Sequence, residues 1–306
     1  MLSFKRLARS PLLVPALLGA LFTLAVTRNR LIPGGAYENY GRAMSRHILT
    51  RPWRHYDLAP HAIDLLLSPV GVSRFFEFDF VARNLSTNSE QMLDISSPRL
   101  FSLYQASLRP SLQVTMSNPD TRDIAITQKL SHILGLKNVT TKNLAVSALA
   151  ASNQKYDDVL SISVLEHIAG EDGDILAIKA LAGMVRQGGR LIVTVPVDRS
   201  YVEEYRDEDT YGLQDKHDKA SYLFERRYDL NALVERLVAT VGAKTVHVKW
   251  AGEIRAGSWD RYINAWRRWG LVMRSMDRYI YSNHWKRFDS WNEMPGAGVC
   301  GIVFHF

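Results

Sequence analysis

The feature that most constrains the fold of this 306-residue sequence is a regular alternation of apolar runs and helical patterns through its middle. Between the runs, apolar residues such as Ile124 and Leu130 recur at helical spacing. Strands that are buried on both faces and joined by helices form a parallel sheet. We therefore expect a doubly wound α/β fold, which binds ligands at the carboxyl ends of its strands. The five predicted strands are 91–96, 111–118, 138–143, 156–163 and 190–197.

The C-terminal part departs from this simple alternation. Residues 229–242 predict a helix and residues 243–254 a sixth strand, while 258–282 reads as one or two further helices. A last apolar run, 297–306, predicts a strand that reaches the end of the chain. Because no simple helical crossover leads into it, we expect this strand to join the sheet antiparallel. The prediction is a mostly parallel sheet of seven strands with a helical insertion, 258–290, before the last one.

The insertion at 258–290 is rich in tryptophan and in basic residues. Two interpretations stay open: an interface with membrane headgroups or an anionic acceptor, and an amphipathic helix that packs its tryptophans on the sheet. The residues concerned are Trp259, Trp266, Trp269, Trp285, Arg261, Arg267, Arg268, Arg274, Arg278, Lys286 and Arg287.

Composition excludes several classes of protein. Apolar residues make up 46% and charged residues 23%, which suits a packed core and not disorder. The single cysteine, Cys300, excludes a disulfide framework and a cysteine-rich zinc site, and we expect no metal. Of the net charge of +7, residues 1–64 carry +6, with nine basic and three acidic residues. The basic excess is therefore mainly N-terminal, and we expect no nucleic-acid partner.

The N-terminal 32 residues contain an uncharged run, 10–27, with basic residues on both sides. As a helix it would be about 27 Å long, close to the hydrocarbon thickness of a bilayer. Three interpretations compete: a membrane anchor, an apolar helix packed on the domain, and a signal peptide that lacks a good cleavage site. Residues 33–71 read as a connector in which basic and aromatic residues suit either a membrane interface or a solvated linker. The main domain is expected at 72–306.

Two segments carry a resemblance to a known family. The first is 156–168, which ends in Leu165-Glu166-His167-Ile168, and the second is the Gly188-Gly189 turn into 190–196. In this order and spacing, they resemble class I S-adenosylmethionine-dependent methyltransferases over about residues 74–306. The resemblance implies a Rossmann-like methyltransferase fold and S-adenosylmethionine as the cofactor.

The resemblance also implies a set of cofactor-binding residues at the ends of the first four strands. Where the family has a Gly-x-Gly turn, this chain has Ser96-Ser97-Pro98-Arg99, so the loop is atypical. Glycine there permits a positive φ and a close approach of the backbone to the ligand. The candidates are Asp94, Ile95, Ser96 and Ser97 at the end of the first strand and in the turn after it, Asn118 and Asp120 at the end of the second, Asn143 and Leu144 at the third, and Ser163 and Val164 at the fourth.

Candidate catalytic residues follow the fourth strand. His167 would titrate near neutral pH as a general base, and Glu166 is a second candidate. Their alternative is a structural role in the turn. Four tyrosines could line an acceptor pocket or occupy ordinary half-buried positions: Tyr201, Tyr205, Tyr211 and Tyr228.

We therefore expect a methyltransferase that acts on a small-molecule, lipid or glycan acceptor next to a membrane surface. Its domain would be cytoplasmic, with residues 10–27 as the anchor. One alternative is a non-catalytic, membrane-associated interaction protein of the same fold, which the missing glycines favour. Another is a Rossmann enzyme that uses NAD, but the Gly-x-Gly-x-x-Gly pattern is absent.

Overall fold

The computed structural model describes residues 13–27, 31–50, 56–210, 212 and 221–306. By its internal contacts, the chain forms two compact units, each built from separate stretches of sequence. Unit 1 comprises Met1–Asp79, Ala251–Phe288 and Asn292–Gly296, and unit 2 comprises Phe80–Trp250, Asp289–Trp291 and Ala297–Phe306. The segments 1–32, 33–71 and 72–306 follow chain order, and as domain boundaries they stay a prediction.

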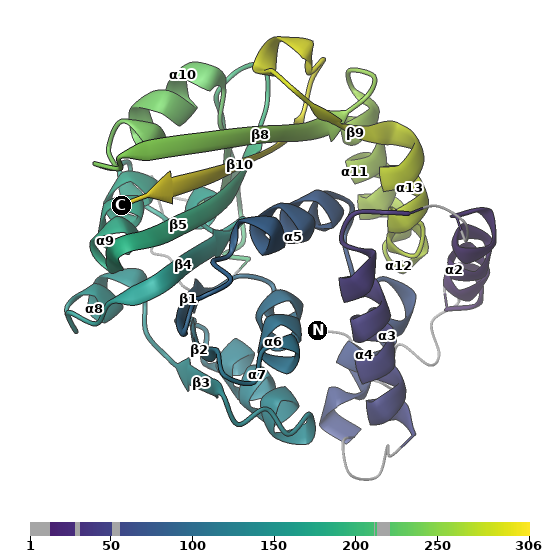
Figure 1. Cartoon of the computed structure of the whole chain (residues 1–306). Coiled ribbons are helices and arrows are strands. Elements are labelled where there is room, and N and C mark those ends of the chain that lie inside the picture. The colour runs from purple at the N-terminus through teal and green to yellow at the C-terminus, as the bar shows by residue number, and fades with distance from the viewer. Residues whose placement is uncertain (1–12, 28–30, 51–55, 211, 213–220) are drawn as a thin grey trace. The chain divides into compact units, whose positions relative to one another are not determined.

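A twisted sheet forms the centre of unit 2, and its strand Trp285–Phe288 comes from a stretch that belongs to unit 1 (Figure 1). Its strands stand in the order β3-β2-β1-β4-β5-β10-β8-β9, and β10 pairs antiparallel with β5 along its whole length. The neighbouring pairs among β1 to β5 are parallel. This order confirms the predicted doubly wound, Rossmann-like fold with an antiparallel C-terminal strand. The strands are β1 (Gln91–Ile95), β2 (Gln113–Ser117), β3 (Val139–Lys142), β4 (Tyr156–Ile162), β5 (Val185–Val197), β8 (Thr245–Glu253), β9 (Trp285–Phe288) and β10 (Gly298–His305).

Helices connect the parallel strands, as the alternation predicts. The central strands are buried on both faces: Leu93, Val159 and Ile192 have no exposed surface. Asp120 begins α7 by accepting a hydrogen bond from the backbone of Arg122, an ordinary N-cap. The helices of unit 2 are α6 (Arg99–Leu108), α7 (Thr121–Ile133), α8 (Val146–Ala150), α9 (Gly173–Gly183), α10 (Leu230–Ala232) and a π-helical stretch, Leu233–Val238, with a short 3-10 turn at Leu165–His167.

Some element boundaries differ from the predicted ones. The helix expected at 173–186 ends at Gly183, because the chain pairs as a strand from Val185, opposite Tyr156. A hairpin of β6 (Val202–Arg206) and β7 (Tyr222–Arg227) forms a separate two-stranded sheet. The insertion expected to be helical over 258–290 ends in strand β9, which makes the main sheet eight-stranded.

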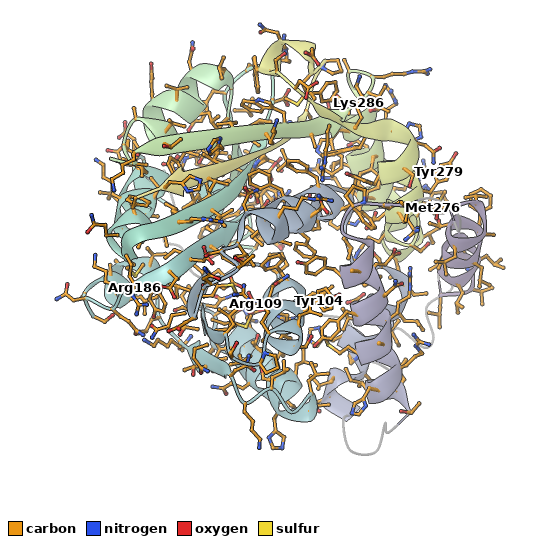
Figure 2. The ribbon with its side chains drawn as sticks, viewed as in Figure 1. Tyr104, Arg109, Arg186, Met276, Tyr279 and Lys286 are labelled. Atoms are coloured by element: carbon orange, nitrogen blue, oxygen red, sulfur yellow. The ribbon has the colours of Figure 1, made fainter. Side chains whose placement is uncertain are left out.

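Unit 1 is built mainly from helices. The segment 33–71, expected as a connector, forms helices whose buried residues include Met44 and Ala62. Helix α2 packs against α4, α12 and α13. Phe22 contacts the ring of Tyr279, which is labelled in Figure 2 and belongs to the helix α13 labelled in Figure 1. The elements are α2 (Leu13–Thr27), α3 (Gly35–Leu49), a 3-10 turn (Tyr56–Leu58), α4 (Ala59–Leu67), the first part of α5 (Val72–Asn84), α11 (Ser258–Trp269), α12 (Leu271–Arg274) and α13 (Asp277–His284), while a last 3-10 turn, Trp291–Glu293, joins stretches of both units.

A buried carboxyl group lies at the centre of unit 1. Asp277 accepts hydrogen bonds from the hydroxyls of Ser68 (2.9 Å) and Tyr262. Burial raises its pKa to about 7. Next to it, Arg278 forms an ion pair with Glu38, whose side chain is 2% exposed. The contacts of Ser68 with Asp277 and of Glu38 with Arg278 join segments more than 200 residues apart in sequence.

The apolar run expected as an anchor, 10–27, is helical from Leu13 to Thr27, and residues 10–12 lie outside the described part. Among the helices of the described ranges, none combines the length and the apolar character needed to cross a bilayer.

Candidate functional site

The carboxyl end of β1 carries a buried acid. Asp94 is 1% exposed, and its carboxylate accepts hydrogen bonds from the backbone of Ser97 (3.2 Å) and from the hydroxyl of Ser102. Burial raises the pKa of Asp94 to about 6, against the opposing effect of these hydrogen bonds. A cationic ligand at this end of the sheet would hold the carboxylate in its charged form.

The turn after β1 adopts the backbone conformation that the missing glycine would supply. Ser96 has a φ of 51°, in the left-handed region, and its backbone donates to the carbonyl of Ser117 at 2.8 Å. The hydroxyl of Ser97 accepts a hydrogen bond from the backbone of Ile162 (2.9 Å) and so ties this turn to the end of β4. Ser163, directly after β4, also has a positive φ, of 47°. Serine thus occupies turns that favour glycine, at a cost of about 1 kcal/mol each.

The end of β2 is polar as well. The side-chain amide of Asn118 donates to Asp123 at 3.1 Å, and Asp123 forms an ion pair with Arg99. Asp120, in contrast, uses its carboxylate to cap α7. The side chain of Asn143 donates to the backbone carbonyls of residues 118 and 119 at 2.8 and 2.9 Å, which braces this turn.

A small cavity of about 10 Å³ lies among these residues. It brings together four of the predicted cofactor residues, and leaves Ile95, Asp120, Asn143, Leu144, Ser163 and Val164 outside its lining. The residues around it are Asp94, Ser96, Ser97, Met116, Ser117, Asn118, Asp123, Ile124 and Thr127. The sequence analysis did not identify Asp123 as a site residue. An acidic residue in the first turn of a helix that follows a strand could have indicated it.

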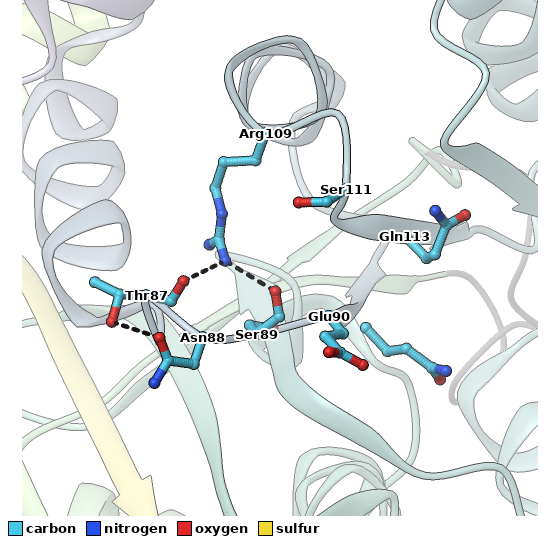
Figure 3. A pocket seen from close by; sticks show the side chains of 8 residues that line it. Thr87, Asn88, Ser89, Glu90, Arg109, Ser111 and Gln113 are labelled. Atoms are coloured by element: carbon cyan, nitrogen blue, oxygen red, sulfur yellow. Dashed lines mark hydrogen bonds between the residues drawn. The ribbon is translucent and has the colours of Figure 1, made fainter.

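A larger cavity, of about 490 Å³, lies at the opposite edge of the sheet (Figure 3). It is lined by the segment before β1 and the loop into β2, including Ser89 and Gln113. Arg109 points into this region but donates to the backbone carbonyls of Thr87 (3.1 Å) and Ser89 (2.9 Å). Since doubly wound sheets bind ligands at the carboxyl ends of their strands, we do not assign the site here.

The predicted catalytic residues lie in the 3-10 turn after β4. The Nδ1 atom of His167 contacts the backbone carbonyl of Phe224. A carbonyl only accepts, so Nδ1 carries the proton and Nε2 of the neutral ring is a base. The Oε1 atom of Glu166 lies 3.7 Å from Nε2, and the Glu166 side chain is 2% exposed. This carboxylate would stabilise an imidazolium after proton uptake.

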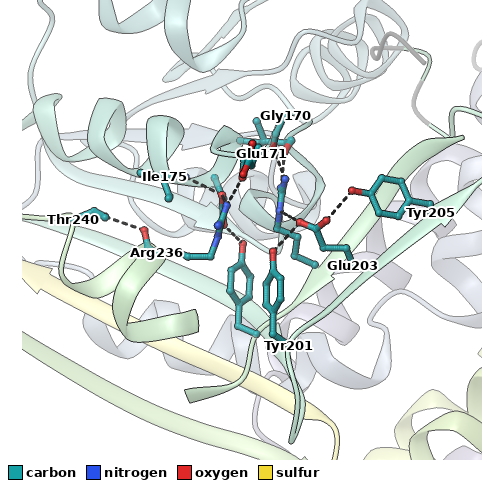
Figure 4. A network of polar contacts seen from close by, with 12 residues as sticks. Gly170, Glu171, Ile175, Tyr201, Glu203, Tyr205, Arg236 and Thr240 are labelled. Atoms are coloured by element: carbon teal, nitrogen blue, oxygen red, sulfur yellow. Dashed lines mark hydrogen bonds and ion pairs between the residues drawn. The ribbon is translucent and has the colours of Figure 1, made fainter. Parts of the chain in front are cut away.

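A polar network fixes the segment that follows His167 (Figure 4). Arg226 is 1% exposed and donates to the carbonyls of Ile168 (2.7 Å) and Gly170. Its Nε donates to Glu203 at 3.0 Å. The hairpin that carries Arg226 is therefore bonded to the turn after β4 through two backbone carbonyls.

The tyrosines considered for an acceptor pocket take part in this network. The hydroxyls of Tyr201 and Tyr205 donate to Glu203 at 2.8 and 2.7 Å. Burial and the neighbouring carboxylate raise the pKa of Tyr201 to about 12. Tyr228 is fully buried and donates to Asp174 at 2.8 Å. Their observed partners are structural ones, and Tyr211 lies outside the described residues.

Asp174 anchors the other side of the network. Burial alone would disfavour its charge, but hydrogen bonds from Arg236 and Tyr228 lower its pKa below the ordinary value. Arg236 also donates to the carbonyl of Glu171. Among the described residues, no group of three or more His, Cys, Asp or Glu side chains is placed to hold a metal ion.

No protein-family model and no curated protein matches the sequence. Among solved structures, coclaurine N-methyltransferase bound to N-methylheliamine and SAH matches with a TM-score of 0.48 and 12% identity, over 74% of this chain and 68% of that one. Phosphoethanolamine N-methyltransferase 2 of Haemonchus contortus matches with a TM-score of 0.48 and 14% identity, over 85% and 59%. The [4+2]-cyclase SpnF matches with a TM-score of 0.45 and 16% identity, over 74% and 79%. Likenesses at these identities concern the fold alone.

Proposed function

We propose that the chain is an S-adenosylmethionine-dependent methyltransferase. The observation that carries the proposal is the convergence of Asp94, Ser97 and Asn118 at the carboxyl ends of β1 and β2. This is the edge at which doubly wound sheets bind ligands. The sequence resemblance of 156–168 and 188–196 to class I methyltransferases supports the same assignment.

The polar side chains at this edge suit the chemistry of the proposed cofactor. Asp94 would interact with its cationic end, and Asn118 and Asp123 would take the ribose hydroxyls, because both side chains accept hydrogen bonds. The left-handed conformation of Ser96 supports this proposal, because a turn of that kind would present its backbone to the ligand. When bound, S-adenosylmethionine supplies a methyl group on a sulfonium, which is open to in-line displacement.

His167 is the proposed general base for an acceptor that must lose a proton. Its Nδ1 contact with the carbonyl of Phe224 holds the tautomer in which Nε2 takes up the proton. Glu166 then balances the charge of the imidazolium. Arg226 and the turn that follows are positioning groups for this histidine.

We propose that the acceptor of the methyl group is a small molecule. More specifically, we propose a lipid or a glycan at a membrane surface. Its support is the composition of the N-terminal part, where an uncharged run is flanked by basic residues. The domain would then face the cytoplasm, where S-adenosylmethionine is made.

The alternative is a non-catalytic protein of the same fold. The observation in its favour is the cavity of about 10 Å³, which is far smaller than ligand pockets of about 300–1,000 Å³. The ion pair between Arg99 and Asp123 stands next to this cavity. Methyltransferase activity therefore requires these side chains to move when the cofactor enters.

Calorimetric titration of the full chain with S-adenosylmethionine and S-adenosylhomocysteine tests the proposal. We expect micromolar binding that is lost in Asp94→Ala and retained in Asp120→Asn, which changes the neighbouring helix cap. NAD in the same assay tests the Rossmann alternative. No binding of either methionine derivative at millimolar concentration would assign the chain to the non-catalytic class. Transfer of labelled methyl to fractions of a lipid extract and of a water-soluble extract then identifies the acceptor class.

A further inference from the structure

We propose that the outward face of α2, together with the last turn of α11, is a docking surface for an anionic lipid bilayer, with α2 lying in the plane of the interface. This specifies the membrane contact that the proposed function leaves open. It does not depend on methyl transfer, so the two proposals fail separately. All the residues concerned belong to unit 1.

The outward face of α2 is apolar at every large side chain. Leu18, Leu21 and Phe22 are 61%, 58% and 49% exposed. Monomeric soluble proteins rarely expose contiguous apolar patches of this kind, and where they do, the patch usually has a partner. The exposed apolar residues of this face are Val14, Leu17, Leu18, Leu21, Phe22, Leu24 and Val26, and Leu31 follows them in the chain.

The inward face of α2 is narrow and made of small residues. Ala16 and Ala20 are buried against Ile63 and Leu67, and Leu271 and Val272 pack on the same cluster. At Gly19 the approach is so close that an added Cβ would stand 2.5 Å from the hydroxyl oxygen of Ser275. Apart from Leu13, which packs on the same cluster, the helix directs its small residues inward and its large apolar residues outward, the reverse of an ordinary surface helix.

The C-terminal end of α2 is also held. Arg278 donates from Nε to the hydroxyl of Thr27 at 2.7 Å and from its terminal nitrogen to the Thr27 carbonyl at 3.3 Å. The same guanidinium pairs with the buried Glu38. Contacts from Ala16 to Thr27 thus fasten the helix along its length, so that only its outward side is open to lipid. An interfacial helix of this kind lies in the membrane plane with its apolar face about 5–10 Å deep.

Charge and aromatic residues next to α2 point to an anionic bilayer as the occupant. The last turn of α11 is Trp266-Arg267-Arg268-Trp269, all four exposed, and Arg268 lies over the ring of Trp269 at 5.3 Å. Trp269 precedes by two residues the Leu271 that packs on α2. No acidic residue occurs in 261–276, and none precedes Glu38 in the sequence. Tryptophan with arginine is the composition of the headgroup region, and the basic residues match anionic lipids.

Flotation of the full chain with lipid vesicles tests the surface. We expect the protein to float with vesicles of phosphatidylcholine and phosphatidylglycerol, and more weakly with phosphatidylcholine alone. The variant Leu17→Gln/Leu18→Gln/Leu21→Gln should lose about tenfold or more of its vesicle partitioning. The matched control is Leu176→Gln, on α9, where a leucine is 66% exposed outside this surface and should change nothing. Arg267→Gln/Arg268→Gln should abolish the preference for phosphatidylglycerol while retaining the weaker binding.

Quenching of tryptophan fluorescence by brominated lipids measures how deeply Trp266 and Trp269 enter the bilayer. We expect shallow bromines to quench more than deep ones, and Trp266→Phe/Trp269→Phe to remove most of that quenching. Partitioning that is unchanged by the leucine substitutions would overturn the proposal, as would stronger quenching by deep bromines. A chain that forms a dimer in the absence of lipid and does not float would also overturn it, since the face would then bind a second copy. Methyl transfer and cofactor binding in these variants report separately on the proposed function.

Discussion

At the scale of single residues, the pKa of Asp94 gives a pH-dependent stability that can be measured. A carboxyl whose pKa is raised to about 6 binds its proton more tightly in the folded chain than in the unfolded one. Its contribution to stability is therefore present below about pH 4 and is lost as the pH rises through 6. The variant Asp94→Asn keeps an acceptor for Ser97 and Ser102 without this titration. We expect its free energy of unfolding relative to the wild type to rise by about 2 kcal/mol between pH 4 and pH 7.

Urea unfolding at several pH values measures this difference. Asp120→Asn is the control, because its carboxylate is part of a solvent-facing helix cap. A difference between Asp94→Asn and the wild type that stays constant from pH 4 to pH 7 would contradict the burial argument.

His167 provides a prediction about the reaction. The variant His167→Gln keeps a side-chain group that can contact the carbonyl of Phe224 but cannot take up a proton at neutral pH. We expect kcat to fall by a factor of about 10²–10⁴. We also expect the pH–rate profile to lose its decline on the acidic side, while the affinity for the cofactor is unchanged. His132→Gln, at the exposed end of α7, is the matched control. Equal rates in the two variants would assign His167 to a structural role.

Part of this site could be predicted because it is local in sequence. Asp94 is the penultimate residue of an apolar strand, Ser96 and Ser97 follow that strand directly, and the register of the motif places all three at its carboxyl end. The partner of Arg99 could not be predicted in this way. Asp123 lies 24 residues away on another helix, and only the packing of α6 and α7 brings the two together. Asn143 was expected near a ligand, but its amide meets two backbone carbonyls that the sequence does not reveal.

At the scale of elements, the hairpin β6–β7 stabilises the turn after β4 through one buried arginine. Replacing Arg226 by methionine would leave the carbonyls of Ile168 and Gly170 and the carboxylate of Glu203 without this donor. We expect Arg226→Met to lower the free energy of unfolding by about 3 kcal/mol.

Denaturant unfolding measures this effect against a matched control. The control is Arg122, whose side chain is 79% exposed and pairs with Asp120 at 3.4 Å. We expect Arg122→Met to lower the free energy of unfolding by less than about 1 kcal/mol. Similar losses in both variants would show that Arg226 does not stabilise the turn after β4.

The elements differ in how far the sequence predicts them. Strands β1, β2 and β4 are short apolar runs, so burial alone marks them, whereas β3 is mostly polar and has no buried residue. The start of β5 depends on its pairing with Tyr156, a contact that no local pattern contains. The hairpin strand Val202–Arg206 is mostly charged, since it is stabilised by cross-strand ion pairs such as Glu203 with Arg226 and not by a core. Pairing between residues distant in sequence therefore determines the start of β5 and the strand Val202–Arg206, which the local sequence pattern does not predict.

At the scale of the whole molecule, two compact units are each assembled from distant stretches of chain. Unit 1 joins the first 79 residues to 251–288, so the segment expected to be an independent domain, 72–306, contains only part of it. Composition along the sequence reveals a basic, apolar N-terminal part, but it cannot reveal which later helices pack on it. The hydrogen bond between Ser68 and Asp277 illustrates this, because it joins positions 209 residues apart.

A chain restricted to 72–306 should therefore lose the order of the helices at 258–288. It lacks Glu38, which pairs with Arg278, and Ser68, which donates to the buried Asp277. We expect trypsin to cleave after Arg278 about tenfold faster or more in the 72–306 chain than in the full chain, because the local unfolding that exposes this bond becomes easier. Cleavage after Arg122, on an exposed face of unit 2, is the internal control and should keep its rate. Equal rates at Arg278 in both chains would mean that 251–288 folds without the N-terminal helices, and that the sequence-based boundary at residue 72 delimits an independent domain.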